Sequence, residues 1–305
     1  MTGKNCNGQV WYDDKGERIQ AHGGCIIEHK GIWYWYGENK SAENVPGTTR
    51  VDVIGISCYS SKDLVNWHYE GLALKVGDNP HSLLRPECVC ERPKVLYNAM
   101  TDKFVMWMHL DDAEYCAAKT GVAISDKPQG PFVMIREMQP NRQDSRDMTL
   151  FQEGERAWLI HSSNWNKTMD ISELTEDYTD VNGRYTSVLI EQEREAPALM
   201  KKGNKYYMIS SGCTGWDPNS ALYAAADYVM GHWKLIDNPC EGKEYRRTFG
   251  GQSTWIFRVQ SEFYLMLDHW KPEDLKNSGY SILPITFNED QMVVKWTDCF
   301  EPDII

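Results

Sequence analysis

The stretch Glu195–Cys213, which reads EAPALMKKGNKYYMISSGC, decides the fold because its pattern occurs five times along the chain. A polar residue opens the pattern, a short apolar strand follows, and a tight turn leads into a strand rich in aromatic residues. The other copies begin at His22, Glu91, Arg146 and Gly251. A hairpin unit repeated every roughly 50–70 residues is typical of a β-propeller. The sequence therefore predicts an all-β fold, a five-bladed β-propeller.

The segments around each copy supply the remaining strands. The turns EHKG, EGER and KKGN contain the residues that hairpin connections favour. Third strands are expected in GISCYSS, GVAISD and ALYAAAD, and fourth strands in NWHYEGLAL, GPFVMIRE and HWKLID. The polar stretch 168–194 is expected to form the outer strands of blade three, and residues 43–52 a loop over the central funnel. Five blades use the whole chain, so residues 1–305 are predicted to form a single domain.

The amino-acid composition and charge argue against some classes of function. A net charge of −12 and a pI near 5.2 argue against nucleic acid, whose phosphates need clustered Lys and Arg. No stretch reaches the about 18 apolar residues of a membrane span, and the first residues lack the pattern of a signal peptide. We expect a cytoplasmic protein with no membrane partner, or a secreted or periplasmic one if a signal was removed.

The cysteines and histidines give little support to a metal centre. The nine cysteines show no zinc-type spacing, and the eight histidines no HExxH motif. In a chain of this size a disulfide framework is unnecessary, so reduced and mostly buried thiols are expected.

Polar residues at the starts of separate blades should meet at the central funnel, because the first strand of a propeller blade lies innermost. These residues are Glu91, Asp147, Glu195 and Gln252. Glycoside hydrolysis with inversion needs one carboxylic acid for the leaving oxygen and a second group that activates water. Glu195 is the candidate acid, since a glutamate in an enclosed, carboxylate-rich pocket should have a raised pKa. A simple ion pair with Arg194 is the structural alternative.

Glu91 and Asp147 each adjoin an arginine, Arg92 and Arg146. Neighbouring residues in a strand point to opposite faces, so the dipeptides should not form simple ion pairs. The two carboxylates could tune Glu195 or bind sugar hydroxyls, or they could anchor backbone N–H groups of loops. The Gly-rich stretch SGCTGWDPN centres on Trp216, whose ring could stack on a sugar.

At these residues the chain resembles glycoside hydrolase family 43. SRDMTLF and EAPAL are similar to motifs of its third and fourth blades. QAHGG, WYWYGENKS, ERPKVLYN, SGCTGWDPN, GGQSTW and LDHWKPEDL are similar to motifs of its exo-β-1,3-galactanase branch. The resemblance runs nearly end to end and implies an inverting glycosidase on a five-bladed propeller.

The resemblance also implies roles for single residues. Glu195 would be the general acid, Glu91 would tune the reaction centre, and Asp147 would hold a sugar hydroxyl. Glu38 would face the galactose, and the remaining predicted substrate contacts are Tyr115, Asn164, Thr214, Trp216 and Gln20.

The blade-one motif departs from the wider family. Most members carry a general-base Asp there, whereas this chain reads IQAHGG, with Gln20 and His22. In the exo-β-1,3-galactanase branch a Gln of the fifth blade positions the water, and Gln252 matches it. A neutral amide is a very poor base, so Gln252 either reacts as an unusual imidic tautomer or only orients water.

The function expected from the resemblance is release of galactose from the non-reducing end of β-1,3-galactan, such as the arabinogalactan backbone. The partner is an oligo- or polysaccharide. No cofactor is required, although a structural calcium ion near His22 and His269 is left open. Two alternatives remain: a β-galactofuranosidase or α-L-arabinofuranosidase on the same scaffold, and a non-catalytic carbohydrate-binding propeller. The missing blade-one Asp favours the latter, whereas the presence of Glu91, Asp147 and Glu195 together favours an enzyme.

Overall fold

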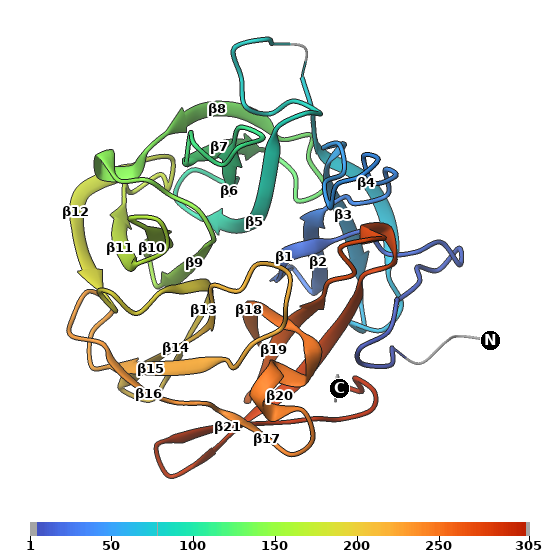
Figure 1. Ribbon diagram of the computed structural model, residues 1–305. Helices are drawn as coiled ribbons and strands as arrows, with labels where there is room; N and C mark the ends of the chain where they lie inside the picture. The colour runs from blue at the N-terminus through green and yellow to red at the C-terminus, as the bar shows by residue number, and fades with distance from the viewer. Residues whose placement is uncertain (1–4, 78, 303–305) are drawn as a thin grey trace.

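Five sheets, antiparallel except for one short edge strand, stand side by side around a central axis (Figure 1). They belong to a computed structural model that describes residues 5–77 and 79–302. Each sheet is one blade, built from consecutive strands that run from the axis outward. The predicted five-bladed β-propeller is confirmed.

The first three blades have four strands each. Blade one contains β1 (His22–His29), β2 (Ile32–Glu38), β3 (Gly55–Ser61) and β4 (His68–Lys75). Blade two contains β5 (Val89–Asn98), β6 (Lys103–Asp111), β7 (Lys119–Ser125) and β8 (Val133–Met138). Blade three contains β9 (Met148–Glu153), β10 (Arg156–Ser163), β11 (Thr168–Leu174) and β12 (Val181–Val188), so the stretch 168–194 supplies its outer strands as predicted.

The last two blades differ by one short strand. Blade four contains β13 (Arg194–Lys202), β14 (Lys205–Gly212), β15 (Leu222–Ala226) and β16 (Lys234–Asp237). Blade five contains β18 (Gln252–Val259), β19 (Glu262–His269), β20 (Gly279–Asn288) and β21 (Gln291–Lys295), and β17 (Cys240–Glu241) joins β21 in parallel at its outer edge. Three short 3₁₀ turns complete the described chain: η1 (Pro140–Arg142), η2 (Tyr245–Gly250) and η3 (Leu275–Asn277).

An apolar cluster fills each of the five seams between neighbouring blades. Representative pairs, in order around the ring, are Tyr36 with Met106, Trp107 with Leu150, Trp158 with Met208, Ile209 with Leu265, and Tyr280 with Trp35. Full burial of one such side chain contributes about 1.5–3 kcal/mol. The aromatic second strands therefore hold the ring together, and the inner strands β1, β5, β9, β13 and β18 surround the axis (Figure 1).

Three inner strands contain a bulge one residue after their polar start. The bulges lie at Gly23, Arg92 and Ala196, whose φ angles are +58°, +53° and +52°. A bulge inserts one residue, bends the strand and re-aims the side chains beside it. Each bulge N–H donates to a carboxylate of a neighbouring blade over 3.0 Å: Gly23 to Asp268, Arg92 to Glu38, and Ala196 to Asp147. The polar starts are thus fixed by contacts between blades.

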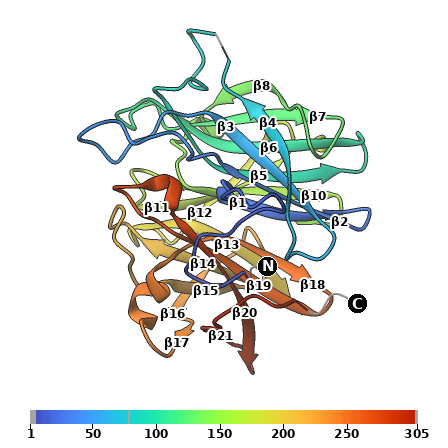
Figure 2. The same ribbon diagram turned by 90° about the vertical axis from the view of Figure 1, so that its right-hand side faces the viewer.

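The ring closes where the N-terminal segment packs onto blade five (Figure 2), and an antiparallel bridge pairs Gln9 with Tyr280 of β20. The side chain of Asn7 is buried and binds the backbone on both sides. Its Nδ2 donates to the Thr297 carbonyl over 2.8 Å, and its Oδ1 accepts from the Ile282 N–H over 2.9 Å. An antiparallel bridge pairs Cys6 with Cys299 beside it.

Replacement of Asn7 by Ala should lower the free energy of unfolding by about 2–4 kcal/mol, because it leaves the Ile282 N–H without its acceptor inside the protein. Urea denaturation measures the change. Asn182→Ala, at an exposed position of β12, is the matched control and should change the free energy by less than about 0.5 kcal/mol. Equal effects of the two substitutions would contradict a role of Asn7 in closing the ring.

No helix among the described residues is both long and apolar enough to cross a membrane.

Candidate active site

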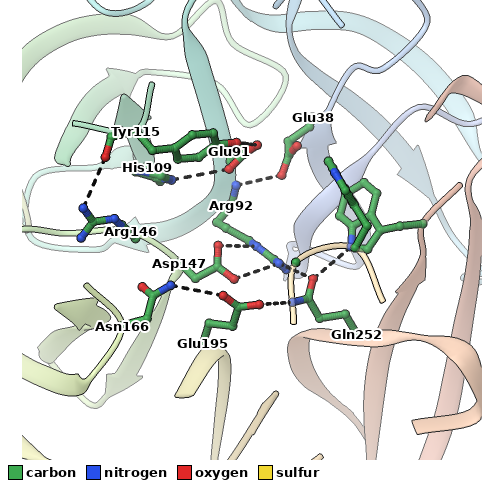
Figure 3. A pocket seen from close by; sticks show the side chains of 13 residues that line it. Glu38, Glu91, Arg92, His109, Tyr115, Arg146, Asp147, Asn166, Glu195 and Gln252 are labelled. Atoms are coloured by element: carbon green, nitrogen blue, oxygen red, sulfur yellow. Dashed lines mark hydrogen bonds and ion pairs between the residues drawn. The ribbon is translucent and has the colours of Figure 1, made fainter. Parts of the chain in front are cut away.

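A pocket of about 290 Å³ opens where the inner strands begin (Figure 3). It is lined by Glu38, Glu91, Arg92, His109, Tyr115, Arg146, Asp147, Asn166, Glu195, Gly215, Trp216, Gln252 and Trp270. All five blades contribute, because the starts of β5, β13 and β18, the approach to β9 and the end of β2 meet here. The convergence of Glu91, Asp147, Glu195 and Gln252 that the repeat predicts is what the structure shows.

The guanidinium of Arg92 connects two of the polar residues, Asp147 and Gln252 (Figure 3). It binds Asp147 through Nε at 3.0 Å and Nη2 at 2.9 Å, and Nη2 also donates to Gln252 Oε1 over 2.6 Å. Two parallel N–H bonds hold the plane of a carboxylate in a way that a lysine cannot. Arg92 pairs with Asp147 and not with Glu91, as expected, but the bulge at Arg92 interrupts the alternation of the strand, so both side chains reach the pocket. Arg146 and Asp147, which precede β9, also share the pocket.

The amide of Gln252 has one orientation. Its Oε1 accepts from Arg92 Nη2 and from Trp270 Nε1, the latter over 3.0 Å. Arginine and tryptophan only donate, so this atom is the oxygen and cannot carry a proton. Nε2 donates to Glu195 Oε1 over 3.0 Å and to Ser211 Oγ over 3.1 Å. An imidic tautomer would need a proton on Oε1, so the surroundings of Gln252 disfavour it and suit an orienting role.

Glu195 has the environment of a proton donor. Burial and the nearby charge of Asp147 raise its pKa to about 8, although Arg92 acts in the opposite direction. At neutral pH the group is therefore protonated. Oε1 accepts from Gln252 Nε2, and Oε2 accepts from Asn166 Nδ2 over 3.3 Å.

Glu91 is the first of three charged side chains in contact within blade two, followed by His109 and Asp111. His109 contacts Glu91 Oε2 at 3.6 Å through Nδ1 and Asp111 at 3.0 Å through Nε2. Burial would raise the pKa of Glu91, but the bond from His109 and the charge of Lys40 outweigh it and bring the pKa to about 2. Burial would likewise lower the pKa of His109, yet Asp111 and Glu91 raise it to about 9. Glu91 is thus a carboxylate and His109 an imidazolium at neutral pH.

Glu38 closes the pocket on the blade-one side. Its Oε2 pairs with Lys40 at 2.8 Å, and its Oε1 accepts the Arg92 N–H. Burial raises the pKa of Glu38, and the charge of Lys40 partly offsets this. The Trp216 indole donates to Thr49 Oγ1 over 3.0 Å and meets the Trp270 ring edge-on at 5.4 Å. The predicted loop 43–52 therefore reaches the pocket mouth.

The structure brings most of the predicted substrate contacts into the pocket. Glu38, Tyr115, Asp147 and Trp216 line it, and the Tyr115 hydroxyl donates to Glu91 over 2.9 Å.

Three predicted contacts do not line the pocket. Gln20 is buried and its amide donates to the Lys276 carbonyl over 2.8 Å. Asn164 is exposed at the start of a hairpin turn, and Asn166, two residues later, takes the pocket position. Thr214 is also exposed and donates to the Asp217 carbonyl, while its neighbours Gly215 and Trp216 face the cavity. These placements depend on backbone geometry that a motif does not specify.

Sequence reasoning missed six pocket residues: Arg92, His109, Arg146, Asn166, Gly215 and Trp270. His109 and Trp270 lie at or just beyond the end of a second strand, where Glu38 also lies. A polar or aromatic residue at that end of each repeat is a signal that could have found them.

The residues expected near a calcium ion have protein partners. His22 Nδ1 contacts Asp268 Oδ1 at 3.2 Å and Nε2 contacts the Tyr280 hydroxyl at 3.0 Å, while His269 Nε2 contacts Ser281 Oγ at 2.7 Å.

In the part of the chain that the structure describes, one group of three side chains could offer metal ligands, Glu91, His109 and Asp147. Arg92 already pairs with this Asp147, and His109 carries a proton, so these residues do not fit a calcium ion. A calcium site elsewhere stays a prediction.

Trp270→Phe should lower kcat about tenfold, because it removes one of the two donors that fix the Gln252 oxygen. Steady-state kinetics measures the loss. Trp255→Phe is the control, since its indole makes a bond of similar length, 2.9 Å to the Ile26 carbonyl, away from the pocket. We expect Trp255→Phe to affect stability but not kcat, and an equal loss of kcat in both variants would contradict the role of Trp270.

A protonated glutamic acid beside ionised carboxylates suits the cleavage of a glycosidic bond. This site on a propeller scaffold defines the class of protein, a propeller glycoside hydrolase. A family model described as glycosyl hydrolases family 43 matches residues 45–293, and the chain belongs to that family.

Two solved structures are similar over nearly the whole chain. The GH43 β-1,3-galactosidase BT3683, solved with galactodeoxynojirimycin, is 38% identical with a TM-score of 0.92, over 97% of this chain and 99% of that one. The exo-β-1,3-galactanase Pc1,3Gal43A from Phanerochaete chrysosporium, solved with galactose, is 31% identical with a TM-score of 0.89, over 96% of this chain and 66% of that one.

A curated relative is more distant. The β-D-galactofuranosidase xynD of Aspergillus niger is 27% identical over 224 residues, which cover 69% of this chain. The match spans 64% of the length of that relative.

Proposed function

We propose that the protein is an inverting, exo-acting β-1,3-galactosidase that releases galactose from the non-reducing end of β-1,3-galactan chains. The observation that carries the proposal is Glu195, a glutamic acid with a pKa of about 8 in a pocket with Glu91 and Asp147. The similarity to proteins named β-1,3-galactosidase and exo-β-1,3-galactanase supports the choice of sugar and linkage.

The pocket residues have different roles in the proposed hydrolysis. Glu195 donates its carboxyl proton to the leaving glycosidic oxygen, and Asp147 keeps that proton bound until then by its negative charge. Gln252, fixed by Arg92 and Trp270, holds the carboxyl of Glu195 in place and does not itself accept a proton. Water attacks the anomeric carbon as the bond to the leaving oxygen breaks, and Glu91, a carboxylate at neutral pH, takes up the proton of that water. Glu38 and Asp147 present carboxylate oxygens that accept hydrogen bonds from sugar hydroxyls.

A galactofuranosidase is the second candidate, and the Aspergillus relative favours it. The fold does not decide between a pyranose and a furanose, because specificity depends on the residues around the pocket. A carbohydrate-binding protein without activity is less consistent with Glu195, since binding alone does not require a carboxyl held protonated at neutral pH.

The test is hydrolysis of β-1,3-galactobiose beside p-nitrophenyl β-galactofuranoside and p-nitrophenyl α-L-arabinofuranoside, with the product anomer followed by proton NMR. We expect turnover of the biose alone, with galactose released first as the α anomer. Cleavage of a furanoside instead would establish the second candidate or its arabinose counterpart. Turnover of none of the three would favour the binding protein.

A further inference from the structure

The turn that carries Trp165 has a strained backbone, and a residue outside the turn stabilises it. Asn164, Trp165 and Asn166 follow β10 with φ angles of +49°, +54° and +61°. Left-handed backbone costs a residue with a side chain about 1–2 kcal/mol and persists only where the surroundings enforce it. Asp144 enforces it, because its carboxylate accepts the N–H of Asn164 at 2.6 Å and that of Trp165 at 3.1 Å.

The indole of Trp165 is exposed but not free to turn. It is 65% exposed, unusual for the largest apolar side chain. The Arg146 guanidinium lies 4.2 Å from the ring centroid, and Arg146 is itself fixed by Asp144 and by the Tyr115 carbonyl. A cation over one ring face leaves the other face open to solvent. The ring is therefore presented in one orientation.

Trp165 stands on the proton-donor side of the pocket. Its neighbour Asn166 donates to Glu195 Oε2, and Arg146, which covers its ring, lines the pocket. Under the proposed function Glu195 must reach the glycosidic oxygen, which links the terminal galactose to the rest of the chain. Groups beside Glu195 therefore flank the leaving part of the substrate.

We propose that Trp165 is the platform for a sugar on the leaving side of the scissile bond. The ligand is a galactopyranose unit of the chain, whose apolar C–H face stacks on the open face of the indole. This inference rests on the proposed function and adds to it a residue that binds the polymer and not the released galactose. Because Asp144 and Arg146 hold the ring in place beforehand, binding loses little to ordering of the platform.

The test measures sugar affinity by calorimetry in a Glu195→Gln background, where no hydrolysis occurs. Trp165→Ala should weaken the binding of β-1,3-galactotriose about tenfold, the size expected for one aromatic stack, and change the binding of galactose less than about twofold. Trp165→Phe should restore part of the loss and guards against a folding defect. Tyr228→Ala, at an aromatic residue that is 76% exposed on another blade, should change neither affinity.

The outcomes separate the two proposals. If Trp165→Ala leaves triose affinity unchanged, or weakens galactose equally, the platform is overturned while the function stands. If the Glu195→Gln protein binds neither sugar, the proposed function is overturned and the platform with it. In the active protein, Trp165→Ala should also lower kcat/KM for the triose about tenfold.

A second inference comes from the ring closure. Cys6 and Cys299 are paired by an antiparallel bridge, and their Sγ atoms lie 3.2 Å apart. Backbone bonds flank the pair, from the Phe300 N–H to the Asn5 carbonyl at 3.0 Å and from the Asn7 N–H to the Asp298 carbonyl at 2.9 Å. Residues opposite each other in antiparallel strands have Cα atoms about 4.5–5.5 Å apart, which is within the range that a disulfide bridges.

The geometry points to a disulfide between Cys6 and Cys299 under oxidising conditions, contrary to the expectation that all nine thiols stay reduced. With glutathione disulfide as oxidant, one thiolate attacks it and releases a glutathione thiol. The second cysteine then attacks the mixed disulfide and releases another. Two protein thiols lose two electrons and two protons, and one disulfide becomes two thiols. The bond would connect the two ends of the chain across the seam between blades one and five.

Incubation with glutathione disulfide tests this inference. We expect two fewer reactive thiols than nine in the denatured protein, and a linked peptide that joins positions 6 and 299. The melting temperature should rise by roughly 5 °C and return with dithiothreitol. Cys6→Ser should abolish these changes, whereas Cys116→Ser, at an exposed cysteine, should not. Nine remaining thiols, or a linkage between other cysteines, would overturn it.

Discussion

Glu195→Gln should lower kcat on β-1,3-galactobiose at least about 1000-fold and leave affinity for galactose within about threefold, because the amide keeps the shape of the acid but has no proton to donate. Steady-state kinetics and calorimetry measure the two quantities. Glu193→Gln, an exposed position two residues away, is the matched control and should behave as wild type.

A substrate with a better leaving group tests the role of Glu195 as the general acid. β-Galactosyl fluoride needs little protonation to depart, so Glu195→Gln should lose far less activity on the fluoride than on the biose. An equal loss on both substrates would contradict the assignment of Glu195 as the acid and indicate a general disturbance of the pocket.

The pH dependence of kcat follows from the pKa of Glu195. Burial and Asp147 raise the pKa of Glu195 to about 8, so the acid is protonated below this pH and loses its proton above it. We expect kcat to fall as the pH rises through about 8. The residual activity of Glu195→Gln should lack this basic limb.

Arg92→Lys should lower kcat about 100-fold and the free energy of unfolding by about 2–4 kcal/mol. The guanidinium is 6% exposed and bonds to Asp147 and Gln252 together. A lysine keeps the charge but not the planar fork, so it cannot hold both partners, and a buried carboxylate with a poorer partner destabilises the fold.

Kinetics and urea denaturation measure the two effects. Arg156→Lys is the control, because that side chain is 58% exposed in its pair with Glu173 and a surface ion pair contributes at most about 1 kcal/mol. If Arg92→Lys kept kcat within about threefold, the orientation of Gln252 would not depend on Arg92.

The blades and their polar starts are predictable from sequence for one physical reason. Each repeat carries the period-two pattern of a half-buried hairpin, and Glu91, Glu195 and Gln252 occupy the same place in that pattern. The first strand of a blade lies innermost, so equal places in the repeat become neighbours in space.

Residues whose placement depends on backbone irregularity are not predictable in this way. The bulge at Arg92 lets two successive side chains enter the pocket, and the three left-handed residues after β10 bring Asn166 inward and leave Asn164 outside. Such conformations depend on partners distant in sequence, such as Glu38 for Arg92 and Asp144 for the β10–β11 turn. Local propensity contains no information about these partners.

The packing at the start of blade one restricts which residue can stand at position 22. His22 occupies the place that Glu91 and Glu195 take in their blades, but it stacks on Tyr280 at 4.6 Å and contacts Asp268. At the adjoining bulge a Cβ on Gly23 would lie 2.0 Å from Glu38 Oε1. A mutation of His22 to Asp would place a buried carboxylate against Asp268, and both would resist ionisation. An aspartate at position 22 thus requires a further change at Asp268, because the single replacement leaves two buried carboxyl groups side by side and destabilises the fold.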